Sequence, residues 1–326
     1  MNPFFFSILR ILSDGKFYSI YELARSLNKD ILYIKNTLLD IQRYGIILQQ
    51  TYEHAYRWVN PIIWMNKDEI NNYLHEDKQF YQFVVLDSVD STNRFLLDCV
   101  GKDFAKFPVN TVIVTELQTM GRGRQGRQWF SGFGDSLTFS LLWRFERSIN
   151  QISGLSLVVG IGIVRALKKF NISDVCLKWP NDVLICFRKL AGILIEVSNN
   201  IRNETFVVIG IGMNVQLSTK TKEYIDQAFT DLFSITGQPI NRNLLLAVLL
   251  TELTSVLNEF NYSGFTFFRN EWLSYHAYDG QLISLLFPDG SIKEGISVGV
   301  DFDGSLRLKL ATGEIRSFNT GELMLS

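Results

Sequence analysis

The first sixty residues show apolar positions at helical spacing, separated by short polar turns. This pattern predicts three helices, at Phe4–Leu12, Ile20–Leu27 and Ile31–Tyr44. Ser19 and Glu22 have the spacing of a capping box at the start of the second helix. Gly45 is placed to end the third helix, because glycine tolerates the left-handed conformation that follows many helices.

Two apolar segments after the third helix, Ile46–Gln50 and Tyr56–Val59, are candidates for a hairpin. Helix, short helix, tight turn, helix and hairpin together are typical of a winged helix-turn-helix domain, which we place at residues 1–62. The candidate residues for DNA contacts are Lys29, Lys35, Asn36 and Arg43. A helical module that binds another protein is the alternative, because fold layout alone does not establish DNA binding.

Residues 63–79 read as a connector with a short helix, and residues 80–268 as a central domain. Strands are predicted at Phe83–Leu86, Thr111–Glu116, Ser136–Arg144, Val175–Trp179, Val183–Phe187, Leu190–Val197 and Thr205–Gln216. Helices are predicted at Ile152–Lys169, Thr221–Phe233 and Asn243–Phe260. Consecutive strands joined by short turns, such as 187–189, predict an α+β domain with a mixed, mostly antiparallel sheet and not a doubly wound one.

The pattern changes again in residues 269–326, where short apolar segments alternate with turn signals. The turns are marked by Asp289-Gly290, Asp303-Gly304 and Thr312-Gly313. Strands at this spacing predict a small β-barrel.

Composition narrows the class of protein. The net charge of −1 over 326 residues gives no overall field that would attract nucleic acid, so any DNA contact must come from a local patch. Cys99, Cys176 and Cys186 form no metal-binding or disulfide pattern, and their apolar neighbours predict buried free thiols in a reducing compartment. The N-terminus lacks the features of a signal peptide, and no apolar run reaches a membrane span of about 18 residues. We therefore expect a cytoplasmic protein.

The most informative segment is Gly121-Arg-Gly-Arg-Gln-Gly-Arg-Gln-Trp129, directly after a predicted strand. Glycine lets the main chain approach a ligand closely, and arginine supplies a planar set of donors that matches phosphate or carboxylate. The glycines match the dinucleotide-binding pattern literally, but no helix follows them, which argues against that fold. An Arg-rich surface loop is the remaining alternative.

A second constellation is Lys178-Trp-Pro-Asn-Asp182, in which Pro180 restrains Trp179 and holds a lysine at a strand end. A fixed ammonium can hold a carboxylate or an α-phosphate. An Asx turn is the alternative, which the neighbouring Arg-Gly loop makes less favoured. Three further motifs could each contact a ligand or have an ordinary structural role. They are Arg188-Lys-Leu-Ala-Gly192, Gly210-Ile-Gly-Met-Asn214 and Asp90-Ser-Thr-Asn93. For the tip at 188–189, taken alone, a solvated turn is the simpler interpretation.

The sequence lacks the residue patterns that a metal site or a catalytic nucleophile would require. The three histidines, His54, His75 and His276, lie outside any metal-ligand spacing, and no nucleophile motif is present. The remaining inventory of positive charge, glycine and fixed donors suits a reaction in which the protein neutralises and aligns anionic reactants, as nucleotidyl transfer requires.

Taken together, the motifs resemble those of biotin protein ligases, and most closely the bifunctional kind that ligates biotin to acetyl-CoA carboxylase and represses the biotin operon. The shared landmarks occur in the order of that family: Asp90–Asn93, Gln118, Gly121–Arg124, Gly126–Trp129, Lys178–Asp182, Arg188–Gly192 and Gly212–Asn214. The resemblance spans almost the whole chain and is most specific in residues 83–214. Lipoate ligases share the central fold but as a group lack the Gly-Arg loop.

The resemblance implies a class II synthetase-like central domain and an SH3-like C-terminal domain. It implies that ATP, with Mg²⁺, and biotin form biotinyl-5′-AMP, and that the biotinyl group then passes to a lysine of the biotin carboxyl carrier protein of acetyl-CoA carboxylase. No protein-fixed metal is indicated. The implied partners are this carrier protein, operator DNA and a second copy of the chain once biotinyl-AMP is bound, with no membrane.

Residue roles follow from the same resemblance. The implied catalytic residues are Arg122, Arg124 and Lys178. The implied biotin-binding residues are Ser91, Thr92, Asn93, Gln118, Arg122, Gly123, Arg124, Lys178 and Gly192. The implied nucleotide-binding residues are Arg124, Arg127, Trp129, Asn181 and Asn214.

This chain departs from the family pattern at a few positions. Thr119 stands where a second Gln is common, and Gln125 and Gln128 stand where basic residues are common, so we expect weaker binding of anions by the loop. The segment 50–56 lacks the usual glycine turn of the wing. Three possibilities therefore stay open: a ligase that also represses transcription, a ligase that no longer binds DNA, and a ligand-sensing regulator without catalysis.

Overall fold

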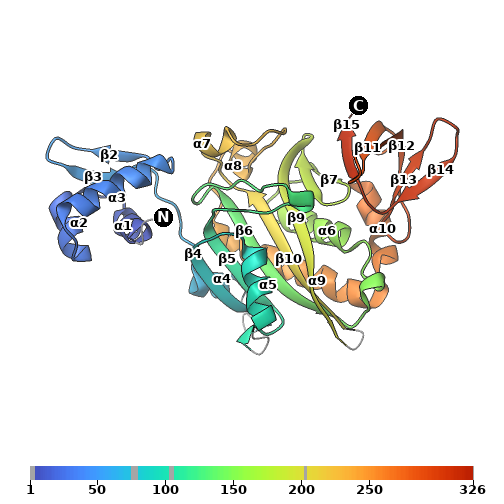
Figure 1. Ribbon diagram of the computed structural model, residues 1–326, viewed down its shortest axis with the longest axis horizontal. Helices are drawn as coiled ribbons and strands as arrows, with labels where there is room; N and C mark the ends of the chain where they lie inside the picture. Colours follow the sequence, from blue (N-terminus) through green and yellow to red (C-terminus); the bar gives the residue numbers. More distant parts are fainter. Residues whose placement is uncertain (1–3, 75–79, 103–105, 202–203, 326) are drawn as a thin grey trace.

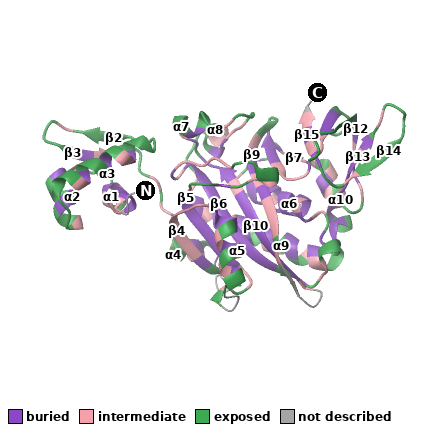
Figure 2. Ribbon diagram, in the orientation of Figure 1, coloured by how far each residue is buried: buried purple, intermediate pink, exposed green. Residues whose placement is uncertain are grey.

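The computed structural model describes residues 4–74, 80–102, 106–201 and 204–325. Figure 1 shows a small group of N-terminal helices and strands beside a large mixed sheet, with a smaller sheet at the other end of the molecule. Buried residues concentrate on the strands of the large sheet and on the helices that cover it (Figure 2).

The N-terminal unit, which we define as residues 4–62, has three helices and a three-stranded sheet of order β1-β3-β2. Its elements are α1 (Phe5–Leu12), α2 (Ile20–Leu27), α3 (Ile31–Arg43), β1 (Tyr18–Ser19), β2 (Leu48–Gln50) and β3 (Ala55–Trp58). The predicted capping box is present, because the Glu22 N–H donates to Ser19 Oγ and the Ser19 N–H donates to the Glu22 carboxylate at 2.7 Å. All three helices begin within one residue of their predicted positions.

The large sheet has seven strands in the order β4-β5-β6-β10-β9-β8-β7. The strands are β4 (Gln82–Val89), β5 (Thr111–Gln118), β6 (Ser136–Phe145), β7 (Val175–Lys178), β8 (Asp182–Ile185), β9 (Arg188–Ile201) and β10 (Glu204–Asn214). Only β4 and β5 pair in parallel, and every other pair in this sheet is antiparallel. The prediction of a mixed, mostly antiparallel sheet is confirmed.

Helices cover the two faces of this sheet unequally. On one face α5 (Thr92–Lys102) packs Leu96 and Val100 against a small cluster that includes Val208. The other face carries the main core beneath α4 (Lys67–Leu74), α6 (Leu155–Lys168), α9 (Arg242–Ser263) and α10 (Phe265–Ser274). α9 is long and apolar enough to span a membrane by length and composition, but over half of it is buried inside this core.

A five-stranded antiparallel sheet of order β14-β13-β12-β11-β15 forms the C-terminal part. Its strands are β11 (Leu282–Leu286), β12 (Ile292–Val300), β13 (Leu306–Lys309), β14 (Ile315–Phe318) and β15 (Glu322–Leu325). The predicted turns are in place, since Gly290, Gly304 and Gly313 all have positive φ. Leu285 and Leu308 belong to the main core, so this sheet shares its hydrophobic cluster with the large sheet.

Three sequence predictions were wrong. The helix expected at Thr221–Phe233 is two short helices, α7 (Thr219–Lys222) and α8 (Leu232–Thr236), because Ser218 and Asp231 each cap a new start. The turn expected at 187–189 lies one residue earlier, where Cys186 and Phe187 adopt positive φ. Cys186 is consequently exposed at this tip and not buried, while Cys99 and Cys176 are partly buried.

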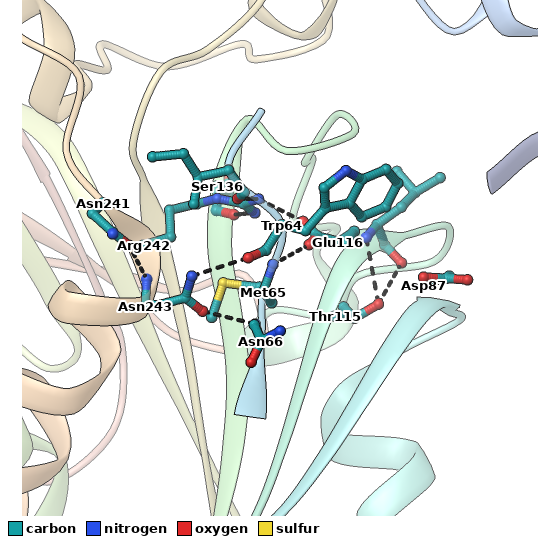
Figure 3. A network of polar contacts seen from close by, with 12 residues as sticks. Trp64, Met65, Asn66, Asp87, Thr115, Glu116, Ser136, Asn241, Arg242 and Asn243 are labelled. Atoms are coloured by element: carbon teal, nitrogen blue, oxygen red, sulfur yellow. Dashed lines mark hydrogen bonds and ion pairs between the residues drawn. The ribbon is translucent and has the colours of Figure 1, made fainter. Parts of the chain in front are cut away.

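The segment 63–66, which the sequence suggests is a connector, is fixed by a buried ion pair (Figure 3). Arg242 at the start of α9 and Glu116 on β5 approach to 2.6 Å, with side chains 4% and 1% exposed. Arg242 also donates to the Ile63 carbonyl at 2.9 Å, and the Met65 N–H donates to the Glu116 carboxylate. The two charges are thus satisfied by each other and by the backbone of the connector.

Asn243, next to Arg242, continues the network seen in Figure 3. Its side chain donates to the Trp64 carbonyl at 2.9 Å and accepts the Asn66 N–H at 2.8 Å. It also donates to Glu69 on α4 at 3.0 Å. Each of residues 63–66 therefore has a backbone hydrogen bond to a buried side chain, although this segment has no regular secondary structure before α4.

Replacing Arg242 by Met should lower the free energy of unfolding by about 3–5 kcal/mol, because the Glu116 carboxylate then stays buried without its partner. The double variant Glu116→Gln/Arg242→Met should recover part of that loss, since no buried charge remains. Urea unfolding of the two single variants and the double variant measures the coupling. Strictly additive losses would contradict a direct pair.

Candidate active site

The face of the large sheet on the side of α5 lacks side chains where β9 and β10 pair. Gly212 on β10 lies opposite Gly192 on β9, and Gly210 follows two residues away on the same face. Because side chains alternate along a strand, the neighbours Ile193 and Ile211 point into the main core and are 3% and 2% exposed. The glycines leave bare backbone, against which a cleft can form.

The indole ring of Trp129 lies over Gly212 and Gly192, and the Asn93 side chain lies over Gly210. A Cβ at Gly212 would overlap the ring, and a Cβ at Gly192 would lie 3.3 Å from it. Trp129 Nε1 is buried and has no hydrogen-bond partner among the described residues. A buried donor without a partner costs free energy, so this N–H is a group that a bound ligand could satisfy.

Beside the glycines, side chains from the start of α5 form a connected polar wall. The N–H of Thr92 donates to Gln118 Oε1 at 2.8 Å. The Ser140 hydroxyl donates to Asn93 Oδ1 at 2.6 Å, and its oxygen lies 2.7 Å from Thr92 Oγ1. The Asn93 amide donates to Glu196 on β9 at 2.9 Å. These contacts occupy the oxygen of Gln118, so its amide nitrogen is the atom that can donate to a ligand.

The Arg-Gly loop, residues 121–129, forms a narrow hairpin-like turn instead of the irregular loop that its glycines suggest. Arg122 and Gln128 form an antiparallel bridge. A single 3₁₀ turn at Arg124–Gly126 makes the tip, where Gln125 has φ of 54°. The loop therefore projects its arginines from a defined backbone.

The three arginines of this loop reach three different elements. Arg122 pairs with Glu196 on β9 at 3.0 Å, Arg124 donates to Asn181 at 3.5 Å, and Arg127 forms a two-pronged ion pair with Glu322 on β15. Burial lowers the pKa of Arg124, and the nearby Asp182 carboxylate opposes that shift. The loop is thus tied to both the large sheet and the C-terminal sheet.

Two lysines face the cleft in different ways. Lys189 lies 2.8 Å from the Asp182 carboxylate, and its side chain is 18% exposed. In the part of the chain that is described, the Lys178 ammonium forms no hydrogen bond or ion pair. Burial lowers the pKa of Lys178, Asp182 opposes this shift, and Lys189 and Arg127 add to it. An ammonium that is held half-buried among other cations is ready to receive an anion.

These groups surround one cleft, which encloses about 950 Å³ including its open mouth. All but one of the residues predicted to bind biotin or nucleotide line it: Ser91, Thr92, Asn93, Gln118, Arg122, Gly123, Arg124, Arg127, Trp129, Lys178, Asn181 and Gly192. The exception is Asn214, which is 3% exposed and donates to the carbonyls of Lys189 and Thr230. Its amide supports the cleft wall from behind.

Sequence reasoning missed several residues of this site. Lys189, Asp182, Gln227 and Glu322 line the cleft, and Glu196 holds Arg122. Lys189 was weighed as part of the Arg188–Gly192 motif, with a solvated turn as the simpler interpretation of the tip taken alone. In the structure the turn lies at 186–187, and Lys189 lines the cleft. The sequence carries no local signal for Glu196 or Glu322, because both meet the loop only through long-range packing.

The residues predicted to contact DNA lie apart from the cleft, on the N-terminal unit. Lys35 and Asn36 are exposed on α3, and Arg43 at its end pairs with Asp40 at 3.1 Å. Lys29 precedes α3, and its ammonium lies 4.6 Å from the centre of the Phe4 ring. Two of the four candidates therefore already have partners within the unit.

Two protein-family models match this chain. The model of the biotin/lipoate A/B protein ligase family matches residues 85–214, and that of the biotin protein ligase C-terminal domain matches residues 280–325. Together with the 32% identity to a relative over 98% of this chain, these matches show that the chain belongs to the biotin/lipoate A/B protein ligase family.

Full-length relatives narrow the likeness further. The chain is 32% identical to the bifunctional ligase/repressor BirA of Salmonella typhimurium over 98% of this chain and 96% of that protein. It is 32% identical to the biotin–[acetyl-CoA-carboxylase] ligase of Mycobacterium tuberculosis over 68% and 82% of the two chains. The biotin protein ligase of Aquifex aeolicus in complex with biotin and ATP superimposes with a TM-score of 0.63 at 29% identity, over 74% of this chain and 97% of that one.

Adding a methyl group at Gly212 tests the packing at the centre of the cleft. In Gly212→Ala the new Cβ would overlap the Trp129 indole, so we expect the ring to leave its position over the sheet. The ¹⁵N-labelled indole spectrum should show the Trp129 N–H signal shifted, while the other five tryptophans change little. Gly101→Ala, at an exposed helical position with no atoms near the new methyl group, is the control. An unshifted Trp129 signal would contradict this arrangement.

Proposed function

We propose that this chain is a biotin–[acetyl-CoA-carboxylase] ligase, which forms biotinyl-5′-AMP from biotin and ATP and transfers biotin to a lysine of the biotin carboxyl carrier protein. The observation that carries the proposal is the single cleft that brings the Arg-Gly loop, Lys178 and the glycine floor together. The full-length likeness to bifunctional ligase/repressors and the structural likeness to a ligase bound to biotin and ATP support it.

In the first step the biotin carboxylate attacks the α-phosphorus of ATP and pyrophosphate leaves. Both reactants are anionic, so bringing them together requires positive charge at the point of attack. Lys178, which has no hydrogen-bond or ion-pair partner among the described residues, would hold the carboxylate and α-phosphate. Arg122 and Arg124 would cover them from the loop. Ser91, Thr92, Asn93, Gln118 and Gly192, on the wall and floor beside Gly123, would hold the biotin ring system.

The nucleotide would lie toward Trp129, Arg127 and Asn181, where the unpaired indole N–H offers a donor. Asn214 would act on this pocket through the Lys189 and Thr230 carbonyls. Mg²⁺ would accompany ATP. Because the described residues hold no group of three or more side chains able to bind a metal, the phosphates would supply most of its oxygen ligands, and Asp182 in the wall fits as an additional one.

In the second step the neutral amine of the carrier lysine attacks the acyl carbon of biotinyl-AMP, and AMP leaves with the bonding electrons. The same cations that align the first step stabilise the departing phosphate. The mixed anhydride hydrolyses readily in water, so the loop that covers it also protects it.

We propose a domain organisation that follows the sequence analysis: a winged helix-turn-helix at residues 1–62, a connector at 63–79, a class II synthetase-like domain at 80–268 and an SH3-like domain at 269–326. We also propose that the chain works in the cytoplasm and forms a homodimer when biotinyl-AMP is bound. The free cysteines and the full-length likeness to bifunctional ligase/repressors support these assignments.

Ligase activity is tested by incubating the full chain with biotin, ATP, Mg²⁺ and a carrier domain, and reading the carrier by intact mass. We expect one biotin per carrier domain, dependent on ATP. Lys178→Met should slow the transfer by about 10²-fold or more, the size seen when a charge-stabilising group is removed. Lys293→Met, on an exposed face of β12, is the matched control and should leave the rate unchanged. Absence of transfer by the wild-type chain would refute the assignment.

Repression of transcription is the second candidate function, favoured by the bifunctional relatives and by the exposed Lys35 and Asn36 on α3. In a gel-shift assay on DNA upstream of biotin-biosynthesis genes, we expect biotin plus ATP to promote binding. Lys35→Ala should weaken binding and flatten its salt dependence by about one counterion, whereas Lys293→Ala should not. If the chain ligates biotin normally but does not shift the DNA in the gel, it is a ligase that does not bind DNA.

A further inference from the structure

The chain that leaves the cleft at Trp129 enters the N-terminal unit four residues later. The ring of Phe133 is 6% exposed and belongs to the hydrophobic cluster of that unit, not to the main core. Its ring centre lies 5.8 Å from Phe6, 5.9 Å from Trp58 and 5.4 Å from Trp64. Phe133 is thus a residue of the catalytic part that completes the core of the N-terminal unit.

The backbone on both sides of Phe133 is closely packed. A Cβ at Gly132 would overlap the Asp135 carboxylate, and one at Gly134 would lie 2.7 Å from Ile62 in the connector. The Gly134 N–H donates to the carbonyl of Glu116 at 3.1 Å. Four residues span at most about 14 Å when fully extended, so Phe133 stays within that distance of Trp129.

A second segment joins the cleft to the same unit. Asp135 accepts hydrogen bonds from the Ser218 N–H at 3.0 Å and from the Thr221 hydroxyl. Between them, Lys220 donates to the Arg43 carbonyl at the end of α3, where a cation is also favoured by the helix dipole.

The chain beyond Thr221 returns to the cleft. The Lys189 N–H donates to the Ala228 carbonyl at 2.9 Å, the Thr230 N–H donates to the Lys189 carbonyl at 3.0 Å, and Gln227 lines the cavity. Two segments, 129–135 and 218–230, therefore each contribute one residue to the cleft lining and contact the N-terminal unit, through Phe133 and Lys220, and Asp135 ties one segment to the other.

We propose that Phe133 is a positioning residue through which the N-terminal unit holds the Arg-Gly loop over the bound acyl-adenylate. The inference rests on the proposed ligase function, which supplies the ligand. Coupling between two sites is reciprocal, so a ligand that closes the loop also tightens the docking of the N-terminal unit by the same factor. A ligand in the cleft would then also influence how α3 is oriented for DNA binding.

A purely structural role makes a different prediction. If Phe133 only fills space, its truncation destabilises the N-terminal unit but leaves the retention of ligand unchanged. Leu23 on α2 belongs to the same hydrophobic cluster and is fully buried, yet it is not part of a segment that reaches the cleft. Leu23→Ala is therefore the matched control, since it weakens the same cluster without cutting the connection.

The experiment measures the dissociation rate of biotinyl-AMP from the full chain after it is formed from biotin and ATP. We expect Phe133→Ala to raise this rate about tenfold or more with little change in the maximal rate of adenylate formation, and Phe133→Leu to restore most of the retention. Leu23→Ala should dissociate its adenylate at the wild-type rate. Equal effects of Phe133→Ala and Leu23→Ala, or no effect of either, would overturn the proposal.

Hydrogen exchange measures the reciprocal effect. In the wild-type chain, biotin plus ATP should slow exchange of the α1 amides, and in Phe133→Ala this protection should disappear. Ligand-independent exchange of α1 in the wild type would overturn the coupling while leaving the ligase function intact. Failure of the wild type to form biotinyl-AMP at all would instead refute the proposed function, and the coupling with it.

Discussion

Unbalanced positive charge in a half-buried cleft is the constraint on which the rest of this site depends. Five cations converge there, namely Arg122, Arg124, Arg127, Lys178 and Lys189, and among the described residues three carboxylates pair with them, namely Glu196, Glu322 and Asp182. The side chains of Arg122 and Arg127 are 44% and 57% exposed, whereas Arg124 and Lys178 are partly buried. Holding like charges together in such a partly buried place is unfavourable unless an anion joins them. The fold thus maintains a site that is completed by a negatively charged ligand.

The scaffold explains how the charges can be held so close to the sheet. Bare backbone at Gly192 and Gly212 lets Trp129 lie flat against the strands, and that ring anchors one end of the Arg-Gly loop. The alternate residues of the same strands are buried in the main core, so the floor cannot shift without disturbing it. One face of the antiparallel pair β9 and β10 therefore packs in the main core, and the other face lines the cleft.

Sequence reasoning was most successful where the signal is local. The capping box at Ser19, the strands before and after the Arg-Gly loop and the three N-terminal helices all depend on neighbouring residues, and all were found near their predicted positions. The lysine at Lys178 was also placed correctly at a strand end, because Pro180 and the apolar strand before it are local features.

Long-range packing accounts for what was missed. The inward direction of Lys189 follows from a turn one residue earlier than expected and from backbone pairing with 228–230, which no local pattern encodes. The glycine floor depends on the register between β9 and β10, and the fixed connector depends on an ion pair between residues 126 positions apart. Phe133 likewise reads as an ordinary aromatic residue after a loop, and only the fold shows that it belongs to another core.

A crystal structure of the full chain with biotinyl-AMP, formed from biotin and ATP in the crystallisation mixture, tests the account most directly. The account predicts that a phosphate oxygen lies within hydrogen-bond distance of Lys178 Nζ, that the loop at 121–129 covers the acyl group, and that the adenylate adjoins Trp129. A phosphate held away from the converging cations, or an adenylate bound outside this cleft, would contradict it.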